Sequence, residues 1–591
     1  MPNYKENANL IWQVADLLRG DYKQADYGKV ILPMTVLRRL DSILAPTKET
    51  VLQFLPKVES MKEEAIDITL NKKAGFNFHN RSMYDFNRLV ADPNNIAANL
   101  RNYINGFSQS AREIIQYFDF DGEITKMDDP QTNLLFLVTK RFQEIDLSEM
   151  DTMEMGYIFE ELIRKFAELS NETAGEHFTP REVIRLMVNL IFLNDKEILT
   201  TKGIVKTLYD PACGTGGMLS VAEEYLNEFN PDGRLEVFGQ ELNPESYAIC
   251  KSDMLIKGQN PSNIKFGNSF TVDGLEDSKF DYMLSNPPFG VDWKKAQKII
   301  QAECDKKGFA GRFGAGLPRI NDGSFLFLQH MISKMKQANG GTRIGIVFNG
   351  SPLFTGAAGS GESEIRKWII ENDMLEAIIA LPDQLFYNTG ISTYIWIVTN
   401  HKPIERKGKI QLINAVGKTD NENEIANRFW TKMPRSLGNK RKLMSDEQIS
   451  FITNIYGNFE EGEFSKKYPN EFFAYWRITV EQPLKDEKGK VVKDKNGNPK
   501  PDSNLRDYEN IPFIVKKDGK LKEQTIEEYF EREVIPHVPN AWIDETKTKV
   551  GYEINFTKYF YEFKPLRSLE EIRKDILALE EETKLSLEDI L

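Results

Sequence analysis

The sequence predicts an α/β protein in which a helical N-terminal domain is followed by a mainly parallel, doubly wound sheet. Apolar residues in about the first 150 positions recur at helical spacing, and no β-rich block interrupts them. Between about residues 200 and 400, apolar runs typical of strands alternate with helical segments. Strands separated by helices indicate a parallel sheet with helices packed on it. A helix with a narrow apolar seam is predicted at the C-terminus.

The first predicted domain spans residues 1–150. Its apolar pattern at helical spacing starts at Leu10 and continues, after a break, over residues 30–40. Arg38 and Arg39 interrupt the apolar face of this second run. They are expected to be solvated, which is the commoner environment of arginine, or to meet a partner.

Seven strands are predicted for the second domain, which spans residues 151–402. A helix is expected between the second and third strands, because Asn243 can cap its start, Pro244 suits its first turn and Gly258 its end. The last two strands are close in sequence, which predicts an antiparallel pair at one edge of the sheet. The strands are expected at residues 204–210, 235–241, 264–269, 280–286, 343–349, 375–381 and 393–399.

The rest of the chain is predicted to form an extension over residues 403–565 and a terminal helix over residues 566–591. The hydrophilic segment 485–501 contains an Asn-Gly pair, which predicts a protruding β-ribbon. Ser568 and Glu571 form a capping-box pattern at the start of the terminal helix. The apolar seam of this helix is expected to dock on another helix, either of this chain or of a partner, and the partner is the preferred interpretation. Its apolar side is formed by Leu569, Ile572, Ile576, Leu579, Thr583 and Ile590.

The composition limits the kinds of protein that the chain can be. Its net charge is −13, so a nucleic acid would be bound weakly by the chain alone or through a partner that supplies basic contacts. No apolar run approaches the ~20 residues that cross a bilayer, and the polar N-terminus lacks a secretory pattern. The three scattered cysteines favour a reducing cytoplasm, and the five dispersed histidines provide no cluster for a metal.

A glycine-rich loop follows the first predicted strand, at residues 210–217 (Asp-Pro-Ala-Cys-Gly-Thr-Gly-Gly). Glycines there let the backbone approach a ligand closely. Leu219 stands where a dinucleotide-binding loop needs a third glycine, whereas Glu241 ends the second strand at the spacing of a ribose-binding carboxylate. The pattern favours a nucleoside cofactor such as S-adenosylmethionine. The alternative is a glycine turn that only packs a helix on the sheet.

A second motif, Asn286-Pro287-Pro288-Phe289, ends the apolar strand at 280–286. Proline cannot continue a strand ladder, so the turn presents an amide, two carbonyls and an aromatic face at the carboxyl edge of the sheet. This chemistry suits methylation of an amino group conjugated to a ring. The Asn286 oxygen and the Pro287 carbonyl would accept both N–H bonds, and Phe289 would stack on the ring. The alternative is a tight turn without a catalytic role.

Together these motifs resemble those of the DNA amino-methyltransferases. The cofactor motif precedes the catalytic turn, as in the gamma group of these enzymes. Residues 175–181 (Gly-Glu-His-Phe-Thr-Pro-Arg), upstream of the glycine loop, make the resemblance more specific. Residues 11–19 resemble the pattern expected near the N-terminus of such enzymes. The likeness extends to the modification subunit of type I restriction-modification systems through residues 364–366, 381–382, 385–386 and 388–391.

The resemblance implies a Rossmann-like, S-adenosylmethionine-dependent N6-adenine methyltransferase domain. Glu241 would hold the ribose of the cofactor, and Asn268, where related enzymes often have aspartate, would hold its adenine. Cys213 would be a packing residue rather than a nucleophile. The methionine end would contact Glu176, His177, Phe178, Thr179, Pro180 and Arg181. The loop beneath the cofactor would contribute Asp210, Ala212, Cys213, Gly214 and Gly216. The target adenine would be bound and activated by Asn286, Pro287, Pro288 and Phe289.

The resemblance also implies partners. These are double-stranded DNA, a specificity subunit that reads its sequence, a restriction subunit with motor and nuclease parts, and a second copy of this chain, all in the cytoplasm and without a membrane. Segment 306–322, with four glycines and four basic residues, would contact DNA or form an ordinary surface loop. Three alternatives stay open: a self-sufficient adenine methyltransferase, an enzyme that methylates protein or RNA, and a cofactor-binding scaffold without catalysis.

Overall fold

The structure is a computed structural model that describes residues 3–170, 179–193, 195, 198, 200–338, 340–387, 389–417, 428–517, 519–561 and 568–588. It divides into two compact units, Met1–Ile554 and Asn555–Leu591. Within the described ranges, no helix has both the length and the apolar character needed to span a membrane.

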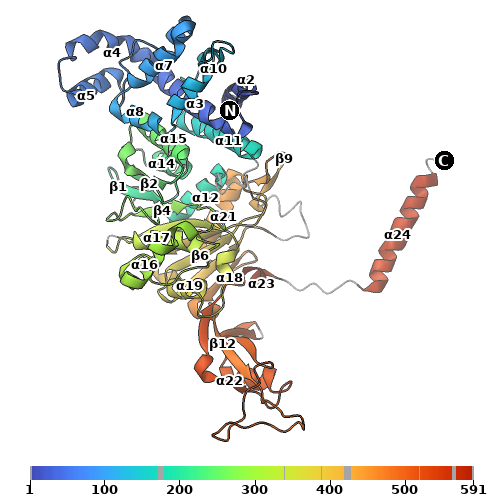
Figure 1. Ribbon diagram of the computed structural model, residues 1–591. Coiled ribbons are helices and arrows are strands. Elements are labelled where there is room, and N and C mark those ends of the chain that lie inside the picture. Colours follow the sequence, from blue (N-terminus) through green and yellow to red (C-terminus); the bar gives the residue numbers. More distant parts are fainter. Residues whose placement is uncertain are drawn as a thin grey trace. The chain divides into compact units, whose positions relative to one another are not determined.

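Helices account for the N-terminal part of the first unit, as predicted, and residues 3–170 contain no strand (Figure 1). One apolar cluster fills their interior and extends onto Ala248, Ile249 and Leu255 of the following domain. The helical region therefore packs directly against the α/β part of the chain. Its helices are α1 (Asn3–Trp12), α2 (Val14–Leu18), α3 (Gly28–Leu44), α4 (Lys48–Phe54), α5 (Glu63–Ala74), α6 (Phe86–Ala91), α7 (Ile96–Asn105), α8 (Gln109–Gln116), α9 (Phe120–Met127), α10 (Leu134–Gln143) and α11 (Thr152–Ser170).

Arg38 and Arg39 are largely buried and bind within the chain, so the favoured prediction that they are solvated is wrong. Arg38 donates to the Ile145 carbonyl over 2.7 Å, and buried Arg39 donates to the carbonyls of Leu147 and Met150. The chain that joins α10 to α11 lacks regular structure here, and its carbonyls need donors that no helix or strand supplies. The two arginines satisfy them.

The central sheet contains all seven predicted strands and two more, so it has nine strands rather than seven. The predicted strands are β1 (Val205–Asp210), β2 (Arg234–Glu241), β3 (Ile264–Phe266), β4 (Tyr282–Ser285), β5 (Arg343–Phe348), β6 (Leu375–Ala380) and β7 (Tyr394–Thr399). The additional strands are β8 (Lys409–Asn414) and β11 (Ser465–Pro469). The order is β11-β8-β6-β7-β5-β4-β1-β2-β3.

Most neighbouring strands in this sheet are parallel, and the carboxyl ends of β1 to β4 meet at one edge. Strands β6 and β7 form the predicted antiparallel pair, but not at an edge, because β7 lies between β5 and β6. Both strands are buried along their whole length, and β8 covers the far side of β6. A continuous buried run of this kind is typical of a central strand.

Helices α12 (Arg181–Phe192), α14 (Gly217–Phe229), α15 (Pro244–Ile256), α16 (Gln297–Lys307), α17 (Ser324–Ser333), α18 (Ser351–Phe354), α19 (Gly361–Glu371) and α21 (Asp446–Asn458) pack around the sheet (Figure 1). Helix α15 carries the predicted signals. The Asn243 side chain accepts a hydrogen bond from the Ser246 amide over 2.8 Å, Pro244 is the first helical residue, and Gly258 has φ +72°.

A second, four-stranded sheet follows, built from β12 (Ala474–Glu481), β13 (Asp507–Pro512), β16 (Trp542–Ile543) and β17 (Lys549–Tyr552). The hairpin of β14 (Ile514–Lys517) and β15 (Lys520–Glu523) accompanies it. The short helix α22 (Ile526–Tyr529) packs beside this sheet. Its small core contains Ile478, Val480, Ile511, Phe530 and Val534. A separate hairpin, β9 (Thr431–Leu437) with β10 (Lys440–Leu443), lies against the central-sheet domain, where the Asn439 amide donates to the Tyr387 carbonyl.

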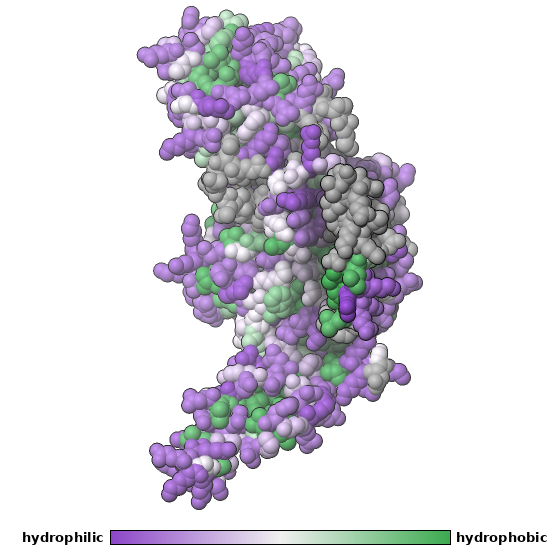
Figure 2. All heavy atoms as spheres, turned by 90° about the vertical axis from the view of Figure 1, so that its right-hand side faces the viewer, coloured by the Kyte–Doolittle hydropathy of each residue, from purple (hydrophilic) through white to green (hydrophobic). Residues whose placement is uncertain are grey.

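The predicted β-ribbon projects from this second sheet (Figure 1). Antiparallel bridges join Pro483 to Pro501 and Lys493 to Pro499. In the predicted Asn-Gly turn, Asp494 accepts backbone N–H bonds through its side chain, and Gly497 has φ +85°. Hydrophilic residues predominate at the lower end of the view in Figure 2, where the second sheet and this ribbon lie.

The second unit contains α23 (Phe556–Phe560) and the terminal helix α24 (Leu569–Glu588). The predicted capping box is present, because Ser568 and Glu571 exchange hydrogen bonds between side chain and backbone in both directions. Leu569, Ile576 and Leu579 of the apolar seam are more than half exposed, and Ile572 is 39% exposed. Ile590 lies outside the described residues, as does the Thr583 side chain.

Candidate active site

A cavity of about 500 Å³ opens at the carboxyl ends of β1 to β4. This is the edge at which open α/β sheets bind their ligands. Four predicted segments contribute to its wall: the glycine loop, the end of β2, the turn after β3, and the Asn-Pro-Pro-Phe turn. The predicted site residues that line it are Thr179, Asp210, Ala212, Cys213, Gly214, Glu241, Asn268, Asn286 and Pro288.

The glycine loop is held tightly between β2 and α15. Its Cys213 amide donates to the Gln240 carbonyl over 3.1 Å. Gly216, at the start of α14, has φ +87°, and a Cβ atom there would lie 2.9 Å from the Cys250 sulfur. The loop therefore needs glycine at this position for both its conformation and its packing. The buried Cys213 side chain lies against Gly239 of β2, where a Cβ atom would be 2.8 Å from its sulfur.

Glu241 fastens the glycine loop to the end of β2. One carboxylate oxygen accepts the Gly214 amide over 2.8 Å, and the other accepts the amides of Leu242 and Asn243 over 2.8 and 2.7 Å. Burial raises the pKa of Glu241 against the opposing effect of these donors. A carboxylate has about four accepting directions. One direction therefore remains for a ligand in the cavity.

Asp210 connects the two motifs. Its Oδ1 accepts the Ala212 amide over 3.0 Å and the Ser285 hydroxyl over 2.8 Å. Ser285 immediately precedes Asn286, so a single buried carboxylate joins the cofactor loop to the Asn-Pro-Pro-Phe turn. Ser285 was not predicted from the sequence.

This environment makes a pH-dependent contribution to stability. Burial raises the pKa of Asp210 to about 7, from an ordinary value of 3.8. The folded protein binds this proton more tightly than the unfolded chain, so the stabilisation is complete below about pH 4 and is lost as the pH rises toward 7. We expect Asp210→Asn, which resembles the protonated acid, to raise the unfolding temperature relative to wild type increasingly over that interval. Thermal unfolding at several pH values checks this, and a constant difference would contradict it.

The turn after β3 forms one wall of the cavity. The Asn268 side-chain oxygen accepts the Phe270 amide over 2.8 Å, and the Ser269 hydroxyl donates to the Pro211 carbonyl over 2.6 Å. Phe270 packs on Phe327 of α17 with ring centroids 4.5 Å apart, and both rings line the cavity. Neither phenylalanine was predicted. Phe270 lies two residues after the predicted Asn268 and could have been found, whereas Phe327 comes from a distant helix.

The Asn-Pro-Pro-Phe turn forms the wall of the cavity after β4. Asn286 is buried and lines the cavity with Pro288, while Pro287 and Phe289 are not among the lining residues. Half-buried Phe289 meets Phe386 edge-on, with centroids 6.5 Å apart. Segment 385–386, one of the further matches to type I modification subunits, therefore packs against the turn.

The N-terminal flank of α12 is described from residue 179 onward. Glu176, His177 and Phe178 lie outside the described residues. Buried Arg181 is not among the residues that line the cavity. Instead it forms an ion pair with Glu160 of α11 over 3.0 Å and donates to the Gly217 carbonyl over 3.3 Å. Glu160, which was not predicted, does line the cavity.

The fold and the site indicate a class of protein, a methyltransferase of α/β architecture with one cavity lined by both its glycine loop and its Asn-Pro-Pro-Phe turn. Comparison with known families agrees. A model described as N-6 DNA Methylase matches residues 150–471, and one described as HsdM N-terminal domain matches residues 7–142. The chain belongs to the N-6 DNA methylase family, among the methylase subunits of type I restriction-modification systems.

Known relatives match over most of their length. The methylase subunit of the type I restriction enzyme MjaIX of Methanocaldococcus jannaschii is 27% identical over 491 residues, which cover 79% of this chain and 80% of that protein. The corresponding MjaVIII subunit is 26% identical over 76% of this chain and 72% of its own. The crystal structure of a type I methyltransferase subunit from Streptococcus thermophilus has a TM-score of 0.61 at 25% identity, and covers 80% of this chain and 97% of that one.

Proposed function

We propose that this chain transfers a methyl group from S-adenosylmethionine to the N6 amino group of an adenine flipped out of double-stranded DNA. It acts as the modification subunit of a type I complex, in which a separate subunit supplies sequence specificity. The observation that carries this proposal is the single cavity lined by both the glycine loop and Asn286, with Asp210 bonded to both segments.

The residues in the cavity fit the nucleoside part of the cofactor. Glu241 retains an accepting direction for a ribose hydroxyl. The Asn268 oxygen is occupied by the Phe270 amide, which leaves its NH₂ group to donate to the adenine ring. Phe270 and Phe327 provide aromatic surface for that ring. When bound, the cofactor supplies an electrophilic methyl group. Glu160 and Thr179 would lie toward its methionine end.

The target-binding half uses the turn itself. The Asn286 side-chain oxygen and the Pro287 carbonyl would accept the two N–H bonds of the amino group, and Phe289 would stack on the base. Accepting both bonds turns the nitrogen lone pair toward the methyl group. The amino nitrogen would then form the new N–C bond as the S–C bond breaks; the electron pair of that bond would stay on the sulfur, and one amino proton would pass to water. Cys213 has no nucleophilic role in this scheme.

In such a complex the chain can have a net charge of −13 and still act on DNA, because its partners would supply most of the DNA contacts. A specificity subunit would supply the base contacts, a second copy of this chain would flank it, and a restriction subunit would join the complex. The helical N-terminal domain would help to enclose DNA, and the exposed seam of α24 would dock on the specificity subunit.

Mass spectrometry of nucleosides from DNA treated with S-adenosylmethionine and this chain tests the proposal. We expect N6-methyladenine only when the specificity subunit is present, and none when the cofactor is omitted. Equal methylation without the partner would favour the self-sufficient enzyme. A complex that binds the cofactor but yields no methyladenine would favour a scaffold or a substrate other than DNA.

The same experiment includes a chain that lacks residues 568–591. If α24 is the docking element, this chain should bind S-adenosylmethionine normally and fail to co-purify with the specificity subunit. Unchanged co-purification would place the docking surface elsewhere.

A further inference from the structure

Residues 291–323 form a lobe that leaves the sheet directly after the Asn-Pro-Pro-Phe turn and closes on itself. The Gly323 amide donates to the Val291 carbonyl over 3.0 Å, and the Trp293 ring nitrogen donates to the Arg319 carbonyl over 2.9 Å. The apolar core of the lobe contains Trp293, Ala296, Ile300 and Phe313, which pack with Leu326 of α17 and with Phe270 from the wall of the cavity.

Within this lobe lies segment 306–322, for which the sequence left a DNA contact and a surface loop open. Its Arg312 turns inward and is only 16% exposed. The guanidinium donates to the Ser269 carbonyl and to the Phe270 carbonyl, each over 2.8 Å. Ser269 and Phe270 both line the cavity, whereas Arg312 does not. Arg312 therefore holds the wall from behind.

The remaining donors of Arg312 are also occupied. Its Nε and Nη2 atoms contact the Glu303 carboxylate of α16, with a shortest distance of 2.7 Å, and Nη1 donates to Nδ1 of His330 over 3.2 Å. All five N–H groups of the guanidinium thus have acceptors. Lysine could not reproduce this pattern, because its single nitrogen cannot reach two carbonyls and a carboxylate in one plane.

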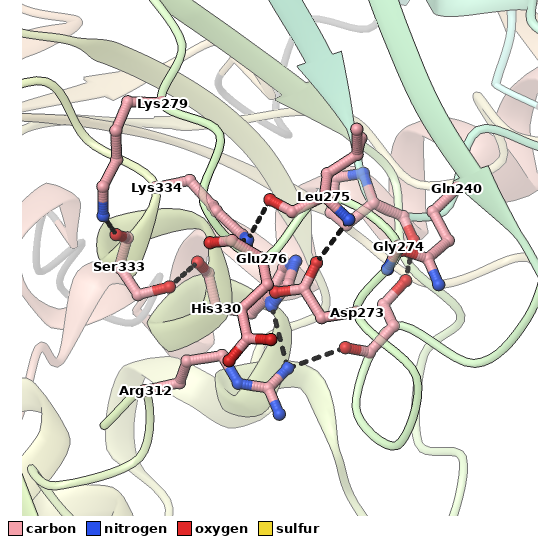
Figure 3. A network of polar contacts seen from close by, with 12 residues as sticks. Gln240, Asp273, Gly274, Leu275, Glu276, Lys279, Arg312, His330, Ser333 and Lys334 are labelled. Carbon is pink, nitrogen blue, oxygen red and sulfur yellow. Dashed lines mark hydrogen bonds and ion pairs between the residues drawn. The ribbon is translucent and has the colours of Figure 1, made fainter. Parts of the chain in front are cut away.

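His330 extends the network to the strand that carries the glycine loop. Figure 3 shows Arg312 pointing at this histidine. Because arginine only donates, Nδ1 must be the acceptor, so Nε2 bears the proton and donates to the Tyr209 hydroxyl over 3.0 Å. Burial lowers the pKa of His330 to about 3, which keeps the ring neutral. Tyr209 immediately precedes Asp210.

Other parts of the same turn are held by separate groups. Gln240 donates to the Gly267 carbonyl over 3.2 Å, and Lys334 forms an ion pair with Asp273 over 2.6 Å and donates to the Leu275 carbonyl (Figure 3). These contacts fix the two ends of the turn. Arg312 acts on its middle, where the wall faces the cavity.

We propose that Arg312 is a positioning residue that holds the wall formed by Asn268, Ser269 and Phe270 in the conformation that binds the cofactor. Cofactor affinity then depends on the lobe that follows the target-binding turn. This inference rests on the proposed use of S-adenosylmethionine. Arg312 touches neither the cavity nor the reacting atoms, so its effect is on affinity rather than on the methyl-transfer step.

The test compares Arg312→Lys with wild type in the complex with the specificity subunit. We expect the dissociation constant for S-adenosylmethionine, measured by calorimetry, to rise about ten- to hundredfold. The KM for the cofactor should rise in parallel, while kcat at saturating cofactor stays within about twofold. Glu303→Gln, which loosens Arg312 without removing it, should give a smaller rise.

Arg366→Lys is the matched control. Arg366 is also buried and also donates to backbone carbonyls, those of Tyr552, Pro352 and Gly356, but none of these residues lines the cavity. The Arg366→Lys variant should have a lower unfolding temperature than wild type and an unchanged affinity for the cofactor. If Arg312→Lys and Glu303→Gln change the affinity no more than this control, or if only kcat falls, the inference is wrong although the proposed function stands. If the wild-type complex does not bind S-adenosylmethionine, the proposed cofactor is wrong and the inference fails with it.

Discussion

Replacement of Asn286 by alanine is expected to reduce the rate of adenine methylation by about 10²–10³-fold while S-adenosylmethionine binds as in wild type. The exocyclic amine of adenine is a poor nucleophile because its lone pair is delocalised into the ring. The buried Asn286 side chain lies in the cavity wall after β4, where its oxygen can accept an N–H bond and localise that lone pair. Alanine removes this acceptor. Single-turnover methylation of a DNA duplex by the complex measures the effect.

Asn286→Asp separates the loss of the acceptor from a general disturbance of the turn. Aspartate keeps an oxygen in the same place, so measurable activity should remain where alanine leaves almost none. Asn372→Ala, at the exposed end of α19, serves as a control without effect on the rate. A normal rate for Asn286→Ala would assign the acceptor role to another group.

The fold was predictable where the local sequence pattern and the tertiary environment agree. Helix α15 has its capping asparagine, its proline and its terminal glycine in order, and each occupies the predicted position. The central strands β4 to β7 are short, mostly apolar and buried along their whole length. The missed strand β8 has a buried glutamine, Gln411, at its centre, and that residue is satisfied by contacts with α21 and β11. A polar residue that finds buried partners far along the chain cannot be recognised from its neighbours in sequence.

The candidate site likewise has residues that local sequence patterns predict and residues that only the tertiary packing brings together. Some residues of each motif line one cavity because both motifs end parallel strands, and the carboxyl ends of such strands share one edge. Glu160 and Phe327 were missed, and Arg312 was expected only as part of a DNA-contacting or surface loop. Each comes from a different helix or loop and reaches the site only through the packing of the whole domain. Arg38 and Arg39 are the converse case, because charged residues that seemed to need water or a partner are satisfied by backbone carbonyls.

Glu241→Gln is expected to weaken S-adenosylmethionine binding by about a hundredfold or more. The native carboxylate accepts three backbone N–H groups, from Gly214, Leu242 and Asn243. A glutamine side chain has one oxygen and one NH₂ group, so its NH₂ must face either the Gly214 amide or the other two. In either orientation a buried donor meets a donor, and the glycine loop separates from the end of β2.

The same substitution removes the negative charge that would accept a ribose hydroxyl, so the loss of ligand contact and the displacement of the loop act in the same direction. Glu236→Gln is a control on the same strand, because Glu236 is 36% exposed and pairs with exposed Arg234. Calorimetry with both variants distinguishes a specific role from a change of net charge. Wild-type affinity in Glu241→Gln would mean that the ribose is held elsewhere in the cavity. A loss confined to Glu241→Gln would assign the effect to this carboxylate rather than to the net charge of the chain, since the glutamine retains the size of the side chain but loses its charge and its second acceptor.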